Sequence, residues 1–544
     1  MNKNLMKSAL LVGVAGSNKA FSLSLYNLKA FCLNDPEIRH SWEMKVVQEP
    51  LVQLDNMEGK LEDMAQMICQ NPPVLLAFSC YMWNIGFFKR LAQIIAERNQ
   101  DIKIVFGGPE ITTDYILEGK HNNTKAHYLV SGEGELTFLN LVQNLSNGKP
   151  LLSEIDGLSF RKKLTDEFSI NRKRSPFPNL SLIPSPFLTG VVDDEVLLRN
   201  NIEANIETQR GCTLKCSYCV YHKDMSKISY STVDRVLAEV KFIANKGVKR
   251  IRFVDANFSS DLVHAKGVMS KLIEEKIEAK IMFELIPGFI DEELAYLFHQ
   301  YNNMYEWNDL TLGVGVQTIN LDVLRLVKRG IKKELFEKTF ELLLKYKVYA
   351  KIDLIIGLPT ESMESINTTL EYMMNKLRNN HEHLLSCHLM RGLPGTELLD
   401  IARIHGLEFT SEFEPHELYQ SPALPRKDLL KTLRRTAVIF RLVNHKGWAK
   451  KEFVQGKRFE DTKIHDAFFR AKDTLRLSNV GLVDLIVAAL LKDLPKESYF
   501  CQDRFPYAET WWWNYSRVEI SDHWLMEFFG SLFEKENTLV IGCA

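Results

Sequence analysis

The chain has 544 residues, of which 45% are hydrophobic and 25% charged, a balance typical of globular protein with large buried cores. Its 68 basic residues nearly cancel its 69 acidic ones, so the net charge is −1 and nothing global favours DNA, RNA or an anionic membrane as partner. Nine cysteines are too few for a disulfide scaffold, and three of them fall within eight positions, as at a metal or redox site in a reducing compartment.

Short apolar runs alternate with amphipathic segments from residue 7 to about 147. The runs, interpreted as strands, are Ala9–Val14, Lys45–Val47, Val74–Phe78, Ile102–Phe106 and Tyr128–Val130. The helical segments are Ser22–Cys32, Lys60–Cys69, Ile85–Arg98 and Leu136–Leu145. This alternation predicts an α/β, doubly wound (Rossmann-like) domain over residues 1–150, whose ligands bind at the carboxyl ends of the strands.

The apolar stretch Ser8–Gly16 is interpreted as the first buried strand rather than a signal peptide, because it is short and a helical pattern follows it. No apolar run approaches the roughly 18 residues that a membrane span needs. We therefore expect a cytoplasmic protein with no membrane span and no nucleic-acid partner.

Residues 151–200 break the alternation. Gly157–Arg161 and Phe168–Asn171 flank a polar segment, as the strands of a β-hairpin do. Four prolines between residues 176 and 186 then indicate a surface linker.

A second strand–helix series begins near residue 204. Its strands are Ala204–Thr208, Arg250–Val254, Lys280–Leu285, Leu310–Val316, Ala350–Ile356 and Leu384–Leu389. Helical segments such as Ser231–Asn245, Asp291–Phe298 and Ser362–Lys376 lie between them. Six βα units predict a partial (βα)₆ barrel over residues 201–425, with functional residues at the C-terminal strand ends. Lys427–Val443 and Val480–Lys492 then predict a mainly helical domain over residues 426–544.

Cys212, Cys216 and Cys219 follow the first strand of the second series, so three thiolates can converge from one loop. A [4Fe–4S] cluster normally takes four cysteines, and three would leave one iron open to a substrate-like ligand. The alternative is a zinc site completed by His222, although zinc ligands usually come as two separated pairs.

Cys-x₃-Cys-x₂-Cys, with Tyr218 before the third cysteine, resembles the signature of the radical S-adenosylmethionine (SAM) superfamily. Further segments at predicted strand ends extend the resemblance over about residues 200–405: Val254–Phe258, Phe283–Glu284 with Pro287, Gly313–Thr318, Asp353–Pro359 and Leu393–Thr396. The resemblance implies that the open iron chelates SAM, which the reduced cluster cleaves to a 5′-deoxyadenosyl radical.

The same resemblance implies a set of cofactor contacts around the barrel. Tyr218 belongs to the cluster motif, Glu284, Gln317 and Thr318 are expected to contact SAM, and Arg329 is expected to neutralise a carboxylate or the cluster. The alternative for each polar residue is an ordinary loop cap.

The N-terminal domain resembles the cobalamin-binding domain fused ahead of many radical SAM barrels, through three loops that follow its third, fourth and fifth strands. The cofactor-binding residues implied are Ser79, Tyr81, Gly107, Gly108, Glu110, Gly132 and Glu133. Tight-turn chemistry is the alternative for the glycines. The loop Gly16–Lys19 has no histidine and the chain lacks an Asp-x-His-x-x-Gly motif, so we expect no lower axial histidine from that loop.

Together these resemblances imply a class B radical SAM methyltransferase-like enzyme with a [4Fe–4S] cluster, SAM and cobalamin. It would take hydrogen from its substrate through the 5′-deoxyadenosyl radical and transfer methyl from methylcobalamin to an unactivated carbon or phosphorus centre. The expected partners are a small-molecule or peptide substrate and a reductant such as flavodoxin or ferredoxin. The alternatives are a cyclase or rearrangement enzyme without methyl transfer and a non-catalytic cobalamin or metal sensor.

Three further features leave alternatives open. A methylthiotransferase-like enzyme would need a second cluster on Cys32, Cys69 and Cys80, of which the first two are interpreted as buried apolar residues. One of His381, His383 and His388 is a candidate proton carrier, although loop and core roles are expected. An aromatic tail is interpreted as helical core, with a wall for substrate or corrin as the alternative: Trp511, Trp512, Trp513, Tyr515 and Trp524.

Overall fold

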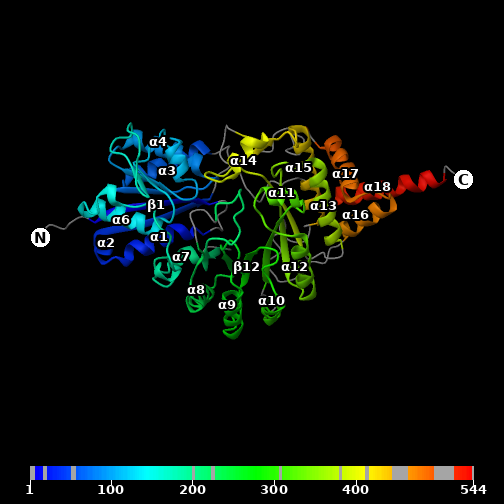
Figure 1. Ribbon diagram of the computed structural model, residues 1–544, viewed down its shortest axis with the longest axis horizontal. Coiled ribbons are helices and arrows are strands. Elements are labelled where there is room, and N and C mark those ends of the chain that lie inside the picture. The colour runs from blue at the N-terminus through cyan, green and yellow to red at the C-terminus, as the bar shows by residue number, and fades with distance from the viewer. Residues whose placement is uncertain are drawn as a thin grey trace. The chain divides into compact units, whose positions relative to one another are not determined.

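The computed structural model describes residues 6–15, 21–50, 57–198, 202–221, 227–305, 309–378, 383–410, 416–443, 463–494, 496 and 520–541 (Figure 1). Its contacts divide the chain into two compact units. The first is Met1–Glu284 with Gly392–Leu399 and Ser411–His416, and the second is Leu285–Arg391 with Asp400–Thr410 and Glu417–Ala544. The predicted domain boundaries at residues 150, 200 and 425 stay predictions.

The first unit opens with a seven-stranded sheet in the order β2-β1-β3-β4-β5-β6-β7. Its strands are β1 (Lys7–Ala15), β2 (Trp42–Pro50), β3 (Leu75–Ser79), β4 (Lys103–Gly107), β5 (Tyr128–Val130), β6 (Leu158–Phe160) and β7 (Ser169–Ile170). The first five are parallel, as the buried apolar runs predict. The strand order reverses at β1, because β2 lies on one side of it and β3 on the other. Ligands of doubly wound sheets bind at such a reversal.

Helices cover both faces of this sheet (Figure 1). One face carries α1 (Leu23–Asn34), α2 (Pro36–Ser41) and α6 (Gly134–Asn147); the other carries α3 (Met57–Gln70) and α4 (Ile85–Arg98). Two apolar cores follow: Leu25 and Phe138 belong to one, Leu61 and Phe88 to the other. The short helix α5 (Thr113–Leu117) lies between β4 and β5. The doubly wound prediction is confirmed.

The predicted hairpin is present as β6 and β7, which pair antiparallel. Sequence did not predict that β6 also pairs antiparallel with β5 and so extends the sheet. The buried guanidinium of Arg161 fastens the hairpin by donating to the carbonyls of Ala126 and Asn122, each at 2.9 Å. The linker after the hairpin contains η3 (Leu180–Leu182) and α7 (Asp194–Leu197). The short helix η2 (Leu152–Glu154) precedes the hairpin.

The first unit also holds the first half of the second series. Strands β8 (Glu203–Ile206), β11 (Arg250–Phe253) and β12 (Lys280–Leu285) run parallel, with helices α8 (Val233–Asn245) and α9 (Leu262–Glu274) between them. A two-residue ladder, which sequence did not predict, joins β9 (Gln209–Arg210) to β10 (Ser229–Tyr230).

The second unit contains the three remaining strands of the series. They are β13 (Asp309–Gln317), β14 (Tyr349–Ile356) and β15 (Leu384–Leu389), and they pair in parallel in that order. Their helices are α10 (Glu292–Met304), α11 (Leu321–Leu326), α12 (Lys333–Lys345) and α13 (Met363–Leu377), followed by α14 (Leu398–His405) and the hairpin β16 (Glu408–Phe409) and β17 (Leu418–Gln420). All six predicted strands of the partial barrel are therefore present.

The C-terminal region is helical, as predicted, with α15 (Arg426–Val443), α16 (Lys463–Thr474), α17 (Asn479–Asp493) and α18 (Asp522–Ile541). Buried Arg435 donates to both carboxylate oxygens of Asp484, at 2.6 and 2.7 Å, and to Asn367 at 2.9 Å, which ties α15 to α17 and α13. Trp511, Trp512, Trp513 and Tyr515 lie outside the described residues. Trp524 stacks on Phe528 with centroids 5.4 Å apart.

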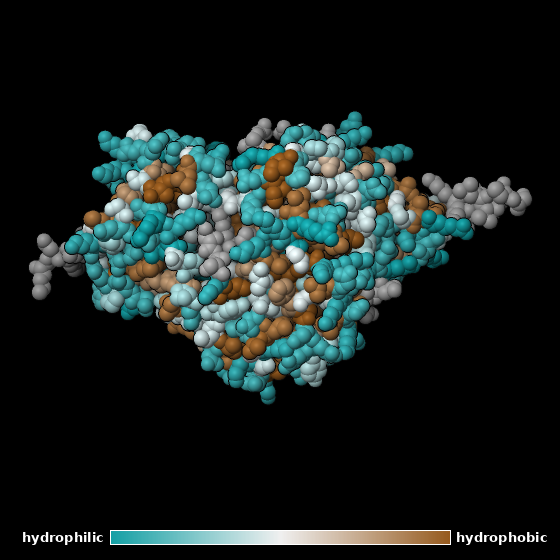
Figure 2. Space-filling view, viewed as in Figure 1, coloured by the Kyte–Doolittle hydropathy of each residue, from teal (hydrophilic) through white to brown (hydrophobic). Residues whose placement is uncertain are grey.

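The surface in Figure 2 shows hydrophobic residues in separate groups among hydrophilic ones. Exposed apolar side chains such as Val263 and Ile404 are normal on folded proteins, and we assign them no function. Within the described ranges no single helix is both long and apolar enough to cross a bilayer. Asp466–Thr474 and Asn479–Asp493 meet the length and composition test only as a pair bent by 106°.

Candidate cofactor sites

Three loops at the carboxyl ends of β3, β4 and β5 contain the residues predicted to bind cobalamin. We call them the cobalamin-side loops: Ser79–Asn84, Gly107–Glu110 and Ser131–Glu135. Because β3, β4 and β5 are adjacent parallel strands, the loops gather at one edge of the sheet. The loop after β1, residues 16–20, lies outside the described residues.

Gly108 lets the first two cobalamin-side loops pack directly on one another. Its φ is +103°, and a Cβ there would lie 2.6 Å from the carbonyl oxygen of Cys80. The Cys80 amide donates to the Gly107 carbonyl at 2.7 Å, and the Glu110 amide to the Cys80 carbonyl at 3.3 Å. The space beside Gly108 is therefore filled by the chain's own backbone.

The loop after β3 is held by Asn84, which sequence analysis did not single out. Buried Asn84 donates to the carbonyls of Val14 and Ser79, and its side-chain oxygen accepts from the Tyr81 amide at 2.7 Å. Tyr81 stacks on Trp83 with centroids 4.5 Å apart. The hydroxyl of Ser24 lies 3.3 Å from that of Ser79 and 3.5 Å from that of Tyr81, so the structure groups predicted Ser79 and Tyr81 at one strand end.

The loop after β5 combines an open glycine with two buried carboxylates. Gly132 has φ +80°, and a Cβ there would meet nothing within 4 Å, so a ligand can approach this backbone. The Glu133 carboxylate accepts from the Phe177 amide at 2.5 Å and from Arg210 at 3.1 Å, and Glu135 accepts from Arg210 at 2.6 Å. Burial raises the pKa of Glu133, whereas for Glu135 the charge and hydrogen bond of Arg210 outweigh burial and lower its pKa.

The three candidate cluster cysteines lie in the segment between β9 and β10, which we call the cysteine loop (residues 211–228). Cys216 is buried, and the Cys219 amide donates to its carbonyl at 3.0 Å, forming a turn between the two. Tyr218 is half-buried in that turn. His222, the fourth ligand of the zinc alternative, lies outside the described residues.

The chemistry of the cysteine loop fits an iron–sulfur cluster. The Ser217 hydroxyl is buried with no hydrogen-bond partner among the described residues, which is costly unless an acceptor such as a cluster sulfide joins it. In that part of the chain no three His, Cys, Asp or Glu side chains already stand together as a metal site. The assignment of Cys212, Cys216 and Cys219 therefore rests on their spacing and loop.

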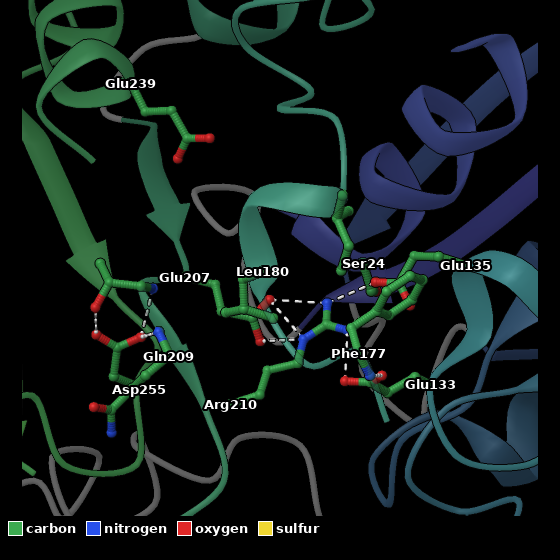
Figure 3. Close-up of polar contacts among 12 residues, drawn as sticks. Ser24, Glu133, Glu135, Phe177, Leu180, Glu207, Gln209, Arg210, Glu239 and Asp255 are labelled. Carbon is green, nitrogen blue, oxygen red and sulfur yellow. Dashed lines mark hydrogen bonds and ion pairs between the residues drawn. The ribbon is translucent and has the colours of Figure 1, made fainter. Parts of the chain in front are cut away.

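Asp255, two residues after the end of β11, anchors the segment that leads into the cysteine loop. Its buried carboxylate accepts from the amides of Thr208 and Gln209, at 2.7 and 3.0 Å, and from the Thr208 hydroxyl at 2.5 Å (Figure 3). Burial raises the pKa of Asp255 to about 7 against these hydrogen bonds. Gln209 also donates to the Asn257 carbonyl at 2.7 Å, so the segment before Cys212 is fixed to the end of β11.

Glu284, the predicted SAM contact at the end of β12, is paired with Arg252 at 3.0 Å. Its side chain keeps 30% of its exposure, so the ion pair leaves the carboxylate accessible.

In the second unit the structure brings Gln317 and Arg329 together over Gly315. A Cβ on Gly315 would lie 2.7 Å from the Gln317 side-chain nitrogen and 3.1 Å from Arg329, which donates to the Gly315 carbonyl. Gln317 has φ +72°, a costly conformation for a non-glycine residue that is concentrated at functional sites. Thr318 is buried and its hydroxyl lies 3.2 Å from that of Thr369, as a structural cap would.

A charged group lies on neighbouring strands of the second unit. Asp353 on β14 contacts Lys351 at 3.2 Å and His388 of β15 at 3.1 Å. Burial acts to raise the pKa of Asp353, but Lys351 and His388 hold it below its usual value. His383 is buried and accepts from the Ala350 amide at 3.1 Å, and burial lowers its pKa to about 4, consistent with the expected core role. His381 lies outside the described residues.

The three cysteines that a second cluster would need, Cys32, Cys69 and Cys80, do not form a common site among the described residues. Cys32 is buried inside α1, where burial and Asp35 raise the pKa of its thiol, and Cys80 is buried at the end of β3. With Cys69 half-buried on α3, they form no metal-like group among the described residues.

Comparison with known proteins identifies the two domains. Residues 206–373 match the model of the Radical SAM superfamily, and residues 43–142 match that of the B12 binding domain. The Radical SAM match implies a [4Fe–4S] cluster and SAM, and the B12 binding domain match implies cobalamin.

Two curated relatives are named as methyltransferases. The chain is 26% identical over 375 residues to the cobalamin-dependent radical SAM methyltransferase TokK of Streptomyces tokunonensis, covering 66% of this chain and 51% of TokK. It is also 26% identical over 373 residues to the 2-(S-pantetheinyl)-carbapenam-3-carboxylate methyltransferase of Streptantibioticus cattleyicolor, with the same shares. The chain thus spans about half the length of these curated relatives.

A solved structure shares the fold. OxsB, a cobalamin-dependent SAM radical enzyme solved with aqua-cobalamin and SAM bound, matches with a TM-score of 0.63 and 13% identity over 98% of this chain and 84% of OxsB. The chain therefore carries a match to the B12 binding domain followed by a match to the Radical SAM superfamily, on a fold that OxsB shares.

Proposed function

We propose that this protein is a methyltransferase that takes hydrogen from a substrate and places a methyl group on an unactivated carbon or phosphorus centre. When bound, the cluster and SAM supply a 5′-deoxyadenosyl radical, and cobalamin carries the methyl group. The observation that carries the proposal is that one compact unit holds both the cobalamin-side loops and the cysteine loop, joined by ion pairs. The methyltransferase names of the relatives support the reaction class.

Different residues are proposed to bind the cluster and SAM. Cys212, Cys216 and Cys219 are proposed to hold the cluster, with Tyr218 beside it. From the resemblance to radical SAM proteins, Glu284, Gln317 and Arg329 are proposed as polar contacts of SAM. Thr318 is proposed as a further contact, with its hydroxyl 3.2 Å from that of Thr369.

The cobalamin-side loops are proposed to hold cobalamin mainly through backbone and small polar groups. Gly132 supplies open backbone, while Ser79 and Tyr81 supply hydroxyl groups at the adjacent strand end. Gly107 and Glu110 shape the loop between them through their hydrogen bonds to Cys80, and Gly108 through its close packing on the Cys80 backbone.

Gly132→Asn is expected to weaken hydroxocobalamin binding at least about tenfold with little loss of stability. Asparagine tolerates positive φ, so strain is small, but its side chain fills the open space. Gly148→Asn is the matched control, because Gly148 has φ +82°, has equally open surroundings and caps the far end of α6. Absorbance titration of both variants checks the assignment, and equal affinities would remove Gly132 from the site.

The experiment that tests the function is anaerobic reconstitution with iron, sulfide and hydroxocobalamin, followed by iron, zinc and cobalt analysis. About four irons and one cobalt per chain are expected, because a [4Fe–4S] cluster and one corrin are required. Turnover with methyl-labelled SAM should then give 5′-deoxyadenosine and a labelled product. Zinc without iron would refute the cluster, and iron without cobalt would refute the cobalamin dependence.

The substrate is proposed to be a small molecule, with a peptide as the second class to screen. We also propose a cytoplasmic location and a flavodoxin- or ferredoxin-type electron donor. Formation of 5′-deoxyadenosine with a rearranged but unlabelled product would assign the cyclase or rearrangement reaction instead. Cofactor binding without SAM cleavage would assign a sensor.

A further inference from the structure

One guanidinium joins the cobalamin-side loop Ser131–Glu135 to β9, the strand that leads into the cysteine loop. Arg210 donates to Glu133 at 3.1 Å, to Glu135 at 2.6 Å and to Glu207 at 2.9 and 3.0 Å. Figure 3 shows the Arg210 side chain between Glu207 on one side and Glu133 with Glu135 on the other. Its partners in the cobalamin-side loop lie 77 and 75 residues earlier in the chain.

The position of Arg210 places it next to both proposed cofactor sites. It is the last residue of β9, two positions before Cys212, and Gly211 between them has φ +99°. Glu133 directly follows Gly132, the glycine with open space beside it. Arg210 is connected to the cysteine loop through the backbone of Gly211 and to Glu133 and Glu135 through its guanidinium, so a shift of either loop acts on this ion group.

Burial makes this ion group strong enough to transmit such a shift. The side chains of Arg210, Glu133 and Glu135 keep only 14%, 11% and 6% of their exposure. Without the arginine, three carboxylates would remain close together, two of them buried and uncompensated.

The geometry of these ion pairs also requires arginine and excludes lysine as an equivalent replacement. The guanidinium reaches three carboxylates with all three of its nitrogens, whereas a lysine ammonium is a single point charge on a flexible stem. Arg210→Lys would keep the charge but not all of these bonds.

We propose that Arg210 is a positioning residue that couples cobalamin binding to cluster assembly, so that each cofactor tightens the binding of the other. The inference rests on the proposed function, since it requires that both cofactors bind. The coupling is reciprocal by thermodynamic linkage and is expected to lie in the usual range of about 5- to 150-fold.

The test compares hydroxocobalamin affinity with and without the cluster. Wild-type protein is titrated after chelator treatment and again after anaerobic reconstitution, and the ratio of the two dissociation constants is the coupling. Arg210→Met is expected to bring that ratio close to one, and Arg210→Lys to give an intermediate ratio. Circular dichroism of each variant checks that it is folded.

Arg235→Met is the matched control. Arg235 is a partly buried arginine of the same unit, paired with Glu239 at 3.1 Å, and it donates to the linker carbonyl of Leu180 rather than to the cobalamin-side loops. It should leave the ratio at the wild-type value.

Three results would overturn the inference: a wild-type ratio of one, an unchanged ratio in Arg210→Met, or an equal loss in Arg235→Met. Failure of wild-type protein to bind cobalamin at all would instead refute the proposed function, so the two failures are distinguishable.

Discussion

Cys216→Ala is expected to abolish cluster assembly and, with it, all cleavage of SAM. The variant removes one of only three thiols in the loop, and a cluster held by two thiolates has lost half of its usual four ligands. The turn itself should survive, because its bond runs from the Cys219 amide to the backbone carbonyl of residue 216. Anaerobic reconstitution should give far fewer than the about four irons of a full cluster, and no 5′-deoxyadenosine by chromatography.

Cys69→Ala serves as the matched control, since Cys69 is a half-buried thiol on α3 that takes no part in the cysteine loop. It should keep wild-type iron content and SAM cleavage. Production of 5′-deoxyadenosine by Cys216→Ala at the wild-type rate would refute the cluster assignment. Loss of iron in both variants would point to damaged folding instead of a lost ligand.

Asp353→Ala is expected to destabilise the second unit by about 3–5 kcal/mol, the usual effect of removing one partner of a buried ion pair. The side chains of Lys351 and Asp353 keep only 5% and 13% of their exposure, so the lysine would lose its carboxylate in a largely dry environment. Urea unfolding followed by circular dichroism measures the loss. Adding Lys351→Met should recover much of it, because an apolar pair of similar volume replaces the ion pair.

The pH dependence follows from the lowered pKa of Asp353. A carboxyl whose folded pKa is depressed contributes stability above its unfolded pKa of about 3.9, and this contribution disappears as pH falls through the folded value. Wild-type protein should therefore lose more stability on acidification below about pH 4 than Asp353→Ala does. An equal loss of stability in the two proteins on acidification would contradict the lowered pKa of Asp353.

The central strands β3, β4 and β5 were predictable because nearly all of their residues are buried. Tyr128–Val130 was predicted to the residue, and Ile102–Phe106 differs by one position from β4 (Lys103–Gly107). A continuous apolar run marks such a strand without help from the rest of the chain. The ladder between β9 and β10 was missed, because two residues per strand are too few to show any periodicity.

The candidate site was predictable only where one segment carries the signal. Cysteine spacing and glycines at strand ends are local, so the cysteine loop and the cobalamin-side loops could be found. The roles of Arg210 and Asp255 could not, because their partners lie 75 and 47 residues away and neither residue type stands out in its own segment. Gly108 was found for its conformational freedom, but the contact that requires glycine, with Cys80, is tertiary.

The ladder of β9 and β10 bears on how the protein acquires its metal. Only two residue pairs close the cysteine loop at its base, Arg210 with Ser229 and Gln209 with Tyr230. Opening so short a ladder costs far less than global unfolding, because Asp255 keeps Gln209 in place and β8 stays paired with β11. We therefore expect the cysteine loop to be able to take up iron and sulfide after the barrel has folded.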